Sequence, residues 1–205
     1  MKRVFVLTMA LCLAITMTVT GQDLTGKMLA GGYAGYTLGL GDPFGTEDFE
    51  LMGVKVETKF DAGISFGGTF HYGVTEKLLI GGELGFQSYK SEVKTDATTI
   101  MGVPIPATDE SASETKMNIL ATGLYALNYT DDENALFVTF GLGLYGGLGD
   151  GDGGEIGLNG GVLYRKMVSE TVGVYVMPRI HYVMSDPAAK MLQIAVGVQM
   201  PLGSE

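Results

Sequence analysis

The sequence predicts an all-β fold: an eight-stranded antiparallel up-and-down β-barrel of the transmembrane kind. Three observations lead to this prediction. Apolar residues alternate with polar or small residues through long segments, which indicates strands with two different faces. Eight such segments occur, and most are longer than the roughly five or six residues usual for strands in soluble proteins. The connections between them alternate between short turns and longer loops, as they do in membrane-spanning barrels.

The composition excludes several other classes of protein. Hydrophobic residues make up 46% of the chain and charged residues 18%, which excludes a disordered chain. The 32 glycines have no period of three, so the chain is not collagen-like, and a single cysteine cannot build a disulfide scaffold. The net charge of −10 argues against a nucleic-acid partner.

The first residues have the layout of a secretory signal peptide. Lys2 and Arg3 precede an apolar run over residues 4–17, and small residues follow up to Gly21. We therefore expect a signal peptide over residues 1–21 and a barrel domain over residues 22–205. An N-terminal membrane anchor is the alternative. Beyond this region no uninterrupted run of about 18 apolar residues occurs, so no further transmembrane helix is expected.

The alternation locates the strands. Residues 60–74 alternate strictly, with Phe66 and Phe70 on one face and Ser65 and Thr69 on the other. The same pattern recurs along the chain. It predicts strands over residues 27–40, 59–74, 77–90, 115–129, 135–148, 155–168, 170–184 and 190–201.

The connections define two ends of the barrel. Short turns are expected near residues 75–76, 130–134 and 169–170, and long loops over 41–58 and 91–114. In outer-membrane barrels the short turns are periplasmic and the longer loops are extracellular, so the N-terminus is expected on the periplasmic side, with the long loops facing outward. These loops are acidic, and they are candidates for contact with an unknown surface partner.

Aromatic residues at the strand ends suggest two interfacial girdles. Tyr72, Tyr129 and Tyr164 end their strands on the apolar face at the short-turn side, and Phe60 and Tyr182 lie on that face at the opposite end. Rings at both edges of an apolar band are typical of membrane barrels. A soluble barrel that hides its apolar face and binds an apolar ligand would use the same alternation, so it stays an alternative.

The run Phe60–Tyr89 contains Gly-Gly-Thr-Phe-His-Tyr-Gly-Val-Thr-Glu-Lys at its centre. It resembles a strand–turn–strand hairpin of small porin-like outer-membrane β-barrel proteins, the OmpA/OmpX-like group. The resemblance implies a monomer in the outer membrane, with outer-membrane lipids and lipopolysaccharide as partners. The aromatic residue that usually ends such barrels is not found in the final Leu202–Glu205.

A barrel of eight strands has an interior just wide enough for its own side chains. Buried charges there must be paired. We therefore expect Glu83 to pair with Arg165 or Arg179, and Asp61 to balance Arg179 or His181. The other residues with inward parity are Ser65, Thr69, His71, Gln87, Asn118, Thr122, Thr139, Asn159, Gln193 and Gln199.

These features favour a structural or surface-interaction role with a plugged lumen. A narrow or gated channel is the alternative. Enzymatic activity is not expected, because His71 and His181 fall at opposite ends of the lumen and no serine accompanies either of them. No cofactor or metal site is expected, since the Gly149–Glu155 loop departs from the order of calcium-binding loops.

Overall fold

The computed structural model describes residues 23–41, 44–51, 54–95, 97–100, 103–129, 134–146, 153–186 and 188–202. The signal peptide expected over residues 1–21 lies outside the described residues and remains a prediction. Within the described ranges, no helix is long and apolar enough to span a membrane.

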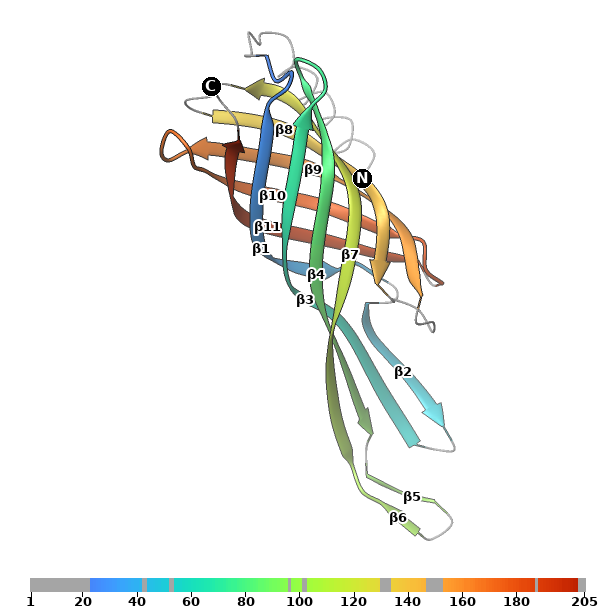
Figure 1. Cartoon of the computed structure of the whole chain (residues 1–205). Coiled ribbons are helices and arrows are strands. Elements are labelled where there is room, and N and C mark those ends of the chain that lie inside the picture. Colours follow the sequence, from blue (N-terminus) through green and yellow to red (C-terminus); the bar gives the residue numbers. More distant parts are fainter. Residues whose placement is uncertain are drawn as a thin grey trace, which may run out of the picture.

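Eight antiparallel strands form a closed barrel (Figure 1). Each strand pairs with its neighbours along the chain, and the first barrel strand pairs with both the last one and the second one, which closes the ring. The predicted fold class is thereby confirmed. The barrel strands are β1 (Met28–Gly39), β3 (Val54–Gly73), β4 (Leu78–Thr95), β7 (Thr108–Tyr129), β8 (Asn134–Gly146), β9 (Gly154–Met167), β10 (Gly173–Val183) and β11 (Ala189–Leu202).

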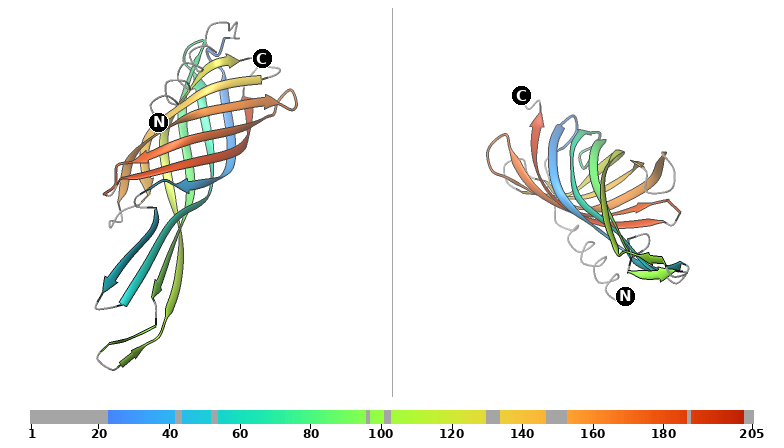
Figure 2. Two further views of the ribbon diagram at one scale, coloured as in Figure 1. Left: turned by 180° about the vertical axis from the view of Figure 1, so that it is seen from behind. Right: turned by 90° about the horizontal axis from the view of Figure 1, so that it is seen from below.

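Three of these strands continue far beyond the barrel. β3, β4 and β7 have 20, 18 and 22 residues, and β2 (Gly45–Leu51) pairs with the extended part of β3. A hairpin of β5 (Thr98–Ile100) and β6 (Val103–Ile105) lies at the far end. We call this extension the arm; it leaves the barrel on one side (Figure 2).

The arm corrects the expectation of long loops over 41–58 and 91–114. Most of these residues are in strands: Val56 pairs with Thr95, and Thr95 pairs with Thr108. The charged residues in these segments suggested loops, but they alternate with valine and threonine, which favour strands.

The outer face of the barrel is apolar and the inner face is mostly polar at mid-height. Ile64 is 63% exposed, whereas its neighbour Ser65 is 1% exposed. This is the orientation of a transmembrane barrel and the reverse of the soluble alternative. Other large outward residues include Phe66, Phe70, Ile80, Leu84, Ile119, Phe140, Leu142, Ile156, Ile180, Ile194 and Val196.

Two irregularities in the ladder change which residues face inward. The pairing of β3 with β4 shifts between Ala62 and Ser65, and the pairing of β7 with β8 shifts between Ala126 and Asn128. A single extra residue reverses the alternation of faces beyond it. The inward and outward assignments made from alternation alone therefore fail past these two points.

Inward glycines in the wall allow close contact between adjacent strands. A Cβ atom added to Gly81 would lie 1.8 Å from the carbonyl oxygen of Phe70, far inside van der Waals contact. The neighbouring Gly82 faces outward, and its Cβ would lie 3.5 Å from the carbonyl oxygen of Leu120, an ordinary contact. Only the first of these two positions requires glycine on steric grounds.

We therefore expect Gly81→Ala to destabilise the barrel by about 1–3 kcal/mol through overpacking. Gly82→Ala is the matched control and should stay within about 0.5 kcal/mol of the parent protein. The free energy of unfolding, measured by urea titration of the protein in lipid vesicles, checks both values. Equal stability of the two variants would contradict the steric reading of the β3–β4 contact.

Candidate functional site

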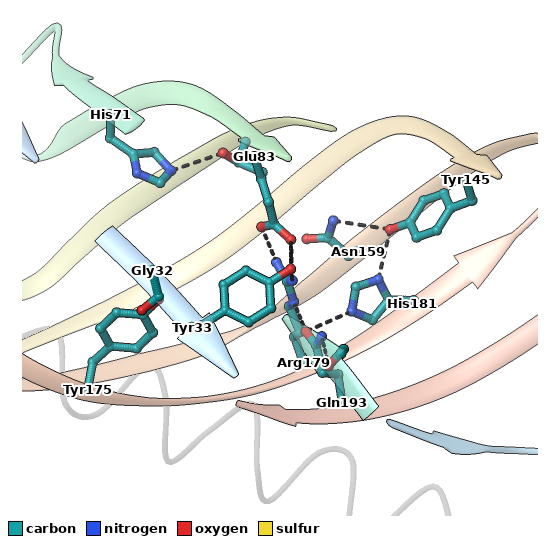
Figure 3. Close-up of polar contacts among 12 residues, drawn as sticks. Gly32, Tyr33, His71, Glu83, Tyr145, Asn159, Tyr175, Arg179, His181 and Gln193 are labelled. Atoms are coloured by element: carbon teal, nitrogen blue, oxygen red, sulfur yellow. Dashed lines mark hydrogen bonds and ion pairs between the residues drawn. The ribbon is translucent and has the colours of Figure 1, made fainter. Parts of the chain in front are cut away.

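The lumen is filled in three layers. At the end with the short turns, apolar and aromatic side chains pack together, among them Leu24, Leu29, Leu79 and Phe137. A polar network occupies the middle (Figure 3). Nearer the arm, a second apolar cluster contains Phe44, Tyr89, Leu120, Tyr145, Val183, Ala189 and Met191.

The centre of the network is an ion pair between Glu83 and Arg179. Both side chains are buried, with 3% and 2% of their surface exposed. Arg179 Nη1 donates to Glu83 Oε2 at 2.6 Å, and Nη2 donates to Glu83 Oε1, which makes the contact bidentate. β4 and β10 stand on opposite sides of the closed ring, so the pair bridges the lumen. The pairing expected for Glu83 is thus with Arg179.

Tyr33 completes the coordination of this pair. Its hydroxyl donates to Glu83 Oε1 at 2.6 Å and accepts from Arg179 Nη2 at 3.3 Å. The tyrosine ring lies against Gly67, where a Cβ would come within 2.8 Å of the ring. Glycine on the adjacent strand therefore leaves the space that the ring occupies.

A chain of hydrogen bonds extends the network toward the arm. Arg179 Nε donates to Gln193 Oε1, and Gln193 Nε2 donates to Ser65 Oγ at 2.7 Å. Gln193 Oε1 can only accept, so His181 Nε2 carries a proton toward it at 3.3 Å. His181 Nδ1 then accepts from the hydroxyl of Tyr145 at 2.8 Å.

The two histidines occupy separate parts of the lumen. His181 lies in the chain just described, and Asn159 Nδ2 also donates to Tyr145 at 3.3 Å. His71 contacts Thr122 Oγ1 at 2.9 Å. Within the described ranges, no group of three or more His, Cys, Asp or Glu residues could hold a metal ion.

Arg165 lies apart from the Glu83 pair. Its side chain is 1% exposed, and its guanidinium carbon lies 5.0 Å from the ring centroid of Tyr129. Arg165, the other arginine expected as a partner for Glu83, therefore lies elsewhere in the lumen, at the short-turn end.

Asp61 does not balance Arg179 or His181, which corrects that prediction. It lies beyond the irregularity in β3, at the base of the arm, and pairs with Lys59 at 2.8 Å in a half-exposed contact. Asp61 also raises the pKa of Lys59, and on the next strand a hydrogen bond from Lys90 lowers the pKa of Glu92. These groups form a charged face on the arm rather than part of the lumen.

The proposed girdle is partly corrected. Tyr72, Tyr164 and Tyr182 face outward, with exposed fractions of 47%, 44% and 41%, but Tyr129 is only 2% exposed. The irregularity between Ala126 and Asn128 turns Tyr129 into the lumen, where it packs against Phe137 at 5.9 Å between ring centroids. Tyr125, 43% exposed, takes the outward position. The side chain of Phe60 lies outside the described part of the structure.

Sequence reasoning missed several residues that fill the lumen. Tyr33 stands in a glycine-rich strand whose alternation is too weak to show on which face its ring lies. Leu24 and Phe44 lie outside the barrel strands, so strand periodicity carries no information about them. Both are buried, with exposed fractions of 0% and 5%.

The closed ladder, the outward apolar belt and the filled interior define the class of this protein as a small transmembrane β-barrel. No protein-family model and no curated protein match the chain.

Solved structures do match. The outer membrane protein OprG from Pseudomonas aeruginosa is 15% identical, with a TM-score of 0.51, covering 91% of this chain and 100% of OprG. A de novo designed transmembrane β-barrel is 11% identical, with a TM-score of 0.39, covering 88% of this chain and 99% of the design. At these identities the similarity concerns the fold alone.

The buried pair generates the first prediction for the site. Glu83→Gln should destabilise the barrel by about 3–5 kcal/mol, because Arg179 is left buried without its counter-charge. Asp61→Asn, which removes an exposed partner, should cost about 1 kcal/mol or less. Urea unfolding in vesicles measures both. Replacing both partners with apolar residues, Glu83→Leu with Arg179→Met, should recover most of the loss; a cost equal to that of Glu83→Gln would contradict the charge explanation.

The corrected orientation of Tyr129 generates a second prediction. Tyr129→Ala should cost about 3–5 kcal/mol by leaving a cavity in the lumen. Tyr125→Ala, on the outer face of the same strand, should cost clearly less because no cavity forms there. If Tyr125→Ala proves the more damaging substitution in the same unfolding assay, the assignment of the two faces is wrong.

Proposed function

We propose that this protein is an outer-membrane barrel that anchors the arm at the cell surface, in a structural or surface-interaction role. The observation that carries the proposal is the filled lumen together with an arm made from the same strands. Apolar layers at both ends and a polar network between them occupy the interior along its length. Such an interior suits an anchor better than a passage for solutes.

The electrostatics of the middle layer support this role. The Glu83–Arg179 pair crosses the lumen from wall to wall, Tyr33 donates a hydrogen bond to Glu83, and Gln193 accepts one from Arg179. An ion moving through the barrel would have to break these contacts in a region of low dielectric constant. A permanently open pore is therefore not what this geometry favours.

The lengths of the strands support the anchoring of an arm. A tilted strand needs about 9–11 residues to cross a bilayer. β3, β4 and β7 have 20, 18 and 22 residues, so about half of each strand remains for the arm. Because the hydrogen-bond ladder runs on from the barrel, the arm is held in a fixed direction.

The proposed partners follow from this position. The outer belt contacts outer-membrane lipids and lipopolysaccharide, and the charged face of the arm, where Lys59 pairs with Asp61 and Lys90 pairs with Glu92, lies near the headgroups. The protein acts as a monomer, and the hairpins within residues 41–58 and 91–114 offer the contact surface for a partner outside the cell.

The anchoring role can be tested on the protein expressed with its leader in a diderm host. We expect recovery in the outer-membrane fraction, a gel mobility that changes on boiling, and no conductance steps in planar bilayers. Recovery as a soluble periplasmic protein would contradict the membrane location. Regular conductance steps from the purified barrel would favour the channel alternative instead.

The direction of the arm gives a separate prediction. An epitope inserted between β5 and β6 should be labelled by antibody on intact cells, because the arm faces outward. The control is the same epitope in the turn of residues 168–172, which should be labelled only after the outer membrane is permeabilised. The opposite pattern would mean that the arm faces the periplasm.

A further inference from the structure

A hollow of about 840 Å³ lies on the outer face of the barrel wall. It spans β1, β3 and β4, and the outward side chains around it are Phe66, Phe70, Leu84 and Phe86. Phe66 and Phe86 stack with their ring centroids 5.3 Å apart, and the other two side chains are exposed. Tyr33 and Glu83 also border the hollow, at strand positions whose side chains point into the lumen. The hollow is therefore on the side of the wall opposite to the polar network.

Three glycines form the floor of the hollow: Gly32 on β1, Gly68 on β3 and Gly82 on β4. Gly32 and Gly68 are register partners, and Gly82 pairs with Phe70, the next outward residue of β3. Phe66 and Phe70 flank Gly68 on the same face, so a ring projects on each side of a residue that has no side chain. The hollow thus exists because three neighbouring outward positions lack side chains.

Packing within the wall does not require glycine at these positions. A Cβ atom would lie 3.6 Å from its nearest neighbour at Gly32, 3.7 Å at Gly68 and 3.5 Å at Gly82, and none of the three has a positive φ angle. The inward Gly31 and Gly67 differ, because a Cβ there would come within 2.7 and 2.6 Å of a carbonyl oxygen. Glycine weakens the interior of a strand, and it often marks a place where a ligand approaches the backbone closely. The three outward glycines therefore fit something outside the wall.

The position of the hollow indicates the chemistry of its occupant. On β3 it lies between Tyr72, at the short-turn edge of the apolar belt, and Asp61, at the charged base of the arm. The residues next to it on β11 and β7, Val198 and Ile119, are exposed and apolar. The hollow is therefore continuous with the surface that a transmembrane barrel turns to the hydrocarbon of the bilayer.

A flexible acyl chain suits this hollow better than a rigid protein surface. An unfilled gap beside the wall would lose dispersion contacts along its lining. Inside a bilayer one apolar surface gains little by leaving another, so close packing decides what binds. A second barrel with the same outer belt would meet the rings of Phe66 and Phe70 before it reached Gly68, whereas an acyl chain can lie between them.

We propose that this hollow, which we call the acyl groove, binds one acyl chain of a phospholipid against Gly32, Gly68 and Gly82. Gly68 is closer along β3 to Tyr72 than to Asp61, so the chain comes from the leaflet on the short-turn side. The inference deepens the lipid partnership proposed above and rests on the proposed outer-membrane location. A barrel that is recovered in the outer membrane but shows no preference for a chain in the groove would contradict this inference alone.

NMR of glycine amides tests the proposal on the folded barrel in deuterated maltoside micelles. The probe is a phosphatidylethanolamine with a nitroxide near the end of one acyl chain. It should broaden the N–H signals of Gly32, Gly68 and Gly82 saturably, at lipid concentrations that leave the Gly160 signal sharp. Gly160 is the matched reference, since it is an exposed glycine on β9 where a Cβ would lie 3.8 Å from its nearest neighbour. Equal broadening of all four signals, or broadening of none, would overturn the proposal.

Filling the groove separates it from the rest of the belt. Gly68→Val places a branched side chain on the floor, so Gly32 and Gly82 should then broaden no earlier than Gly160. Gly160→Val adds the same side chain to β9 and should leave unchanged the lipid concentration at which the groove glycines broaden. A preference that survives Gly68→Val, or that Gly160→Val also removes, would overturn the site. Valine is favoured in strands, so both variants should keep the heat-dependent gel mobility, and Gly82→Val replaces Gly68→Val if that variant does not fold.

A second copy of the barrel is the competing occupant. It would make the Gly32 and Gly82 signals depend on protein concentration in micelles without added lipid, and Gly68→Val would remove that dependence. This result would overturn the acyl groove in favour of a dimer contact. Signals that stay constant over a tenfold range of protein concentration, together with the selective broadening by lipid, are the result expected.

Discussion

The closure of the ladder through β1 is the constraint on which the rest of this structure depends. β1 pairs with β11 on one side and β3 on the other, so the barrel has no open edge to leave backbone groups unpaired in lipid. A ring of eight strands is narrow, and inward side chains from opposite walls can therefore meet. That geometry brings Glu83 on β4 to Arg179 on β10, although the two are 96 residues apart in the sequence.

The same narrow interior explains why polar and apolar layers alternate along it. A buried ion pair gives little net stability, because desolvation of the two charges offsets much of their attraction. The ion pair instead defines the geometry of the network. Glu83, Gln193 and Tyr33 surround Arg179 in one arrangement that uses the N–H donors of the guanidinium. The apolar layers on either side exclude water from this network and strengthen its hydrogen bonds. Arg165 is different, since it is as buried as Arg179 but none of the described residues accepts a hydrogen bond from its guanidinium.

Strand periodicity was enough to predict the barrel and most of its inner and outer faces, since alternation with period two reports directly on which face a residue occupies. It failed at Asp61 and Tyr129, because the alternation of residue types runs unbroken through the irregular positions while the ladder slips by one residue. The choice between Arg165 and Arg179 as partner of Glu83 was also beyond the sequence. It depends on the heights that strand tilt gives to residues on opposite walls. Leu24 and Phe44 were missed because they pack from outside the strands.

The irregularity in β3 has a physical role at the edge of the apolar belt. On β4, outward residues change from Leu84 and Phe86 to Lys90 and Glu92 without any break in the alternation. On β3 the extra residue between Ala62 and Ser65 brings Asp61 opposite Lys90 and Lys59 opposite Glu92. Without it, these charges would fall on the face that continues the lumen. The slip thus aligns the two strands so that both exchange apolar for charged residues at one height, which is where a bilayer surface would cross the wall. The barrel and the arm are therefore one continuous sheet whose outer face is matched first to lipid and then to water.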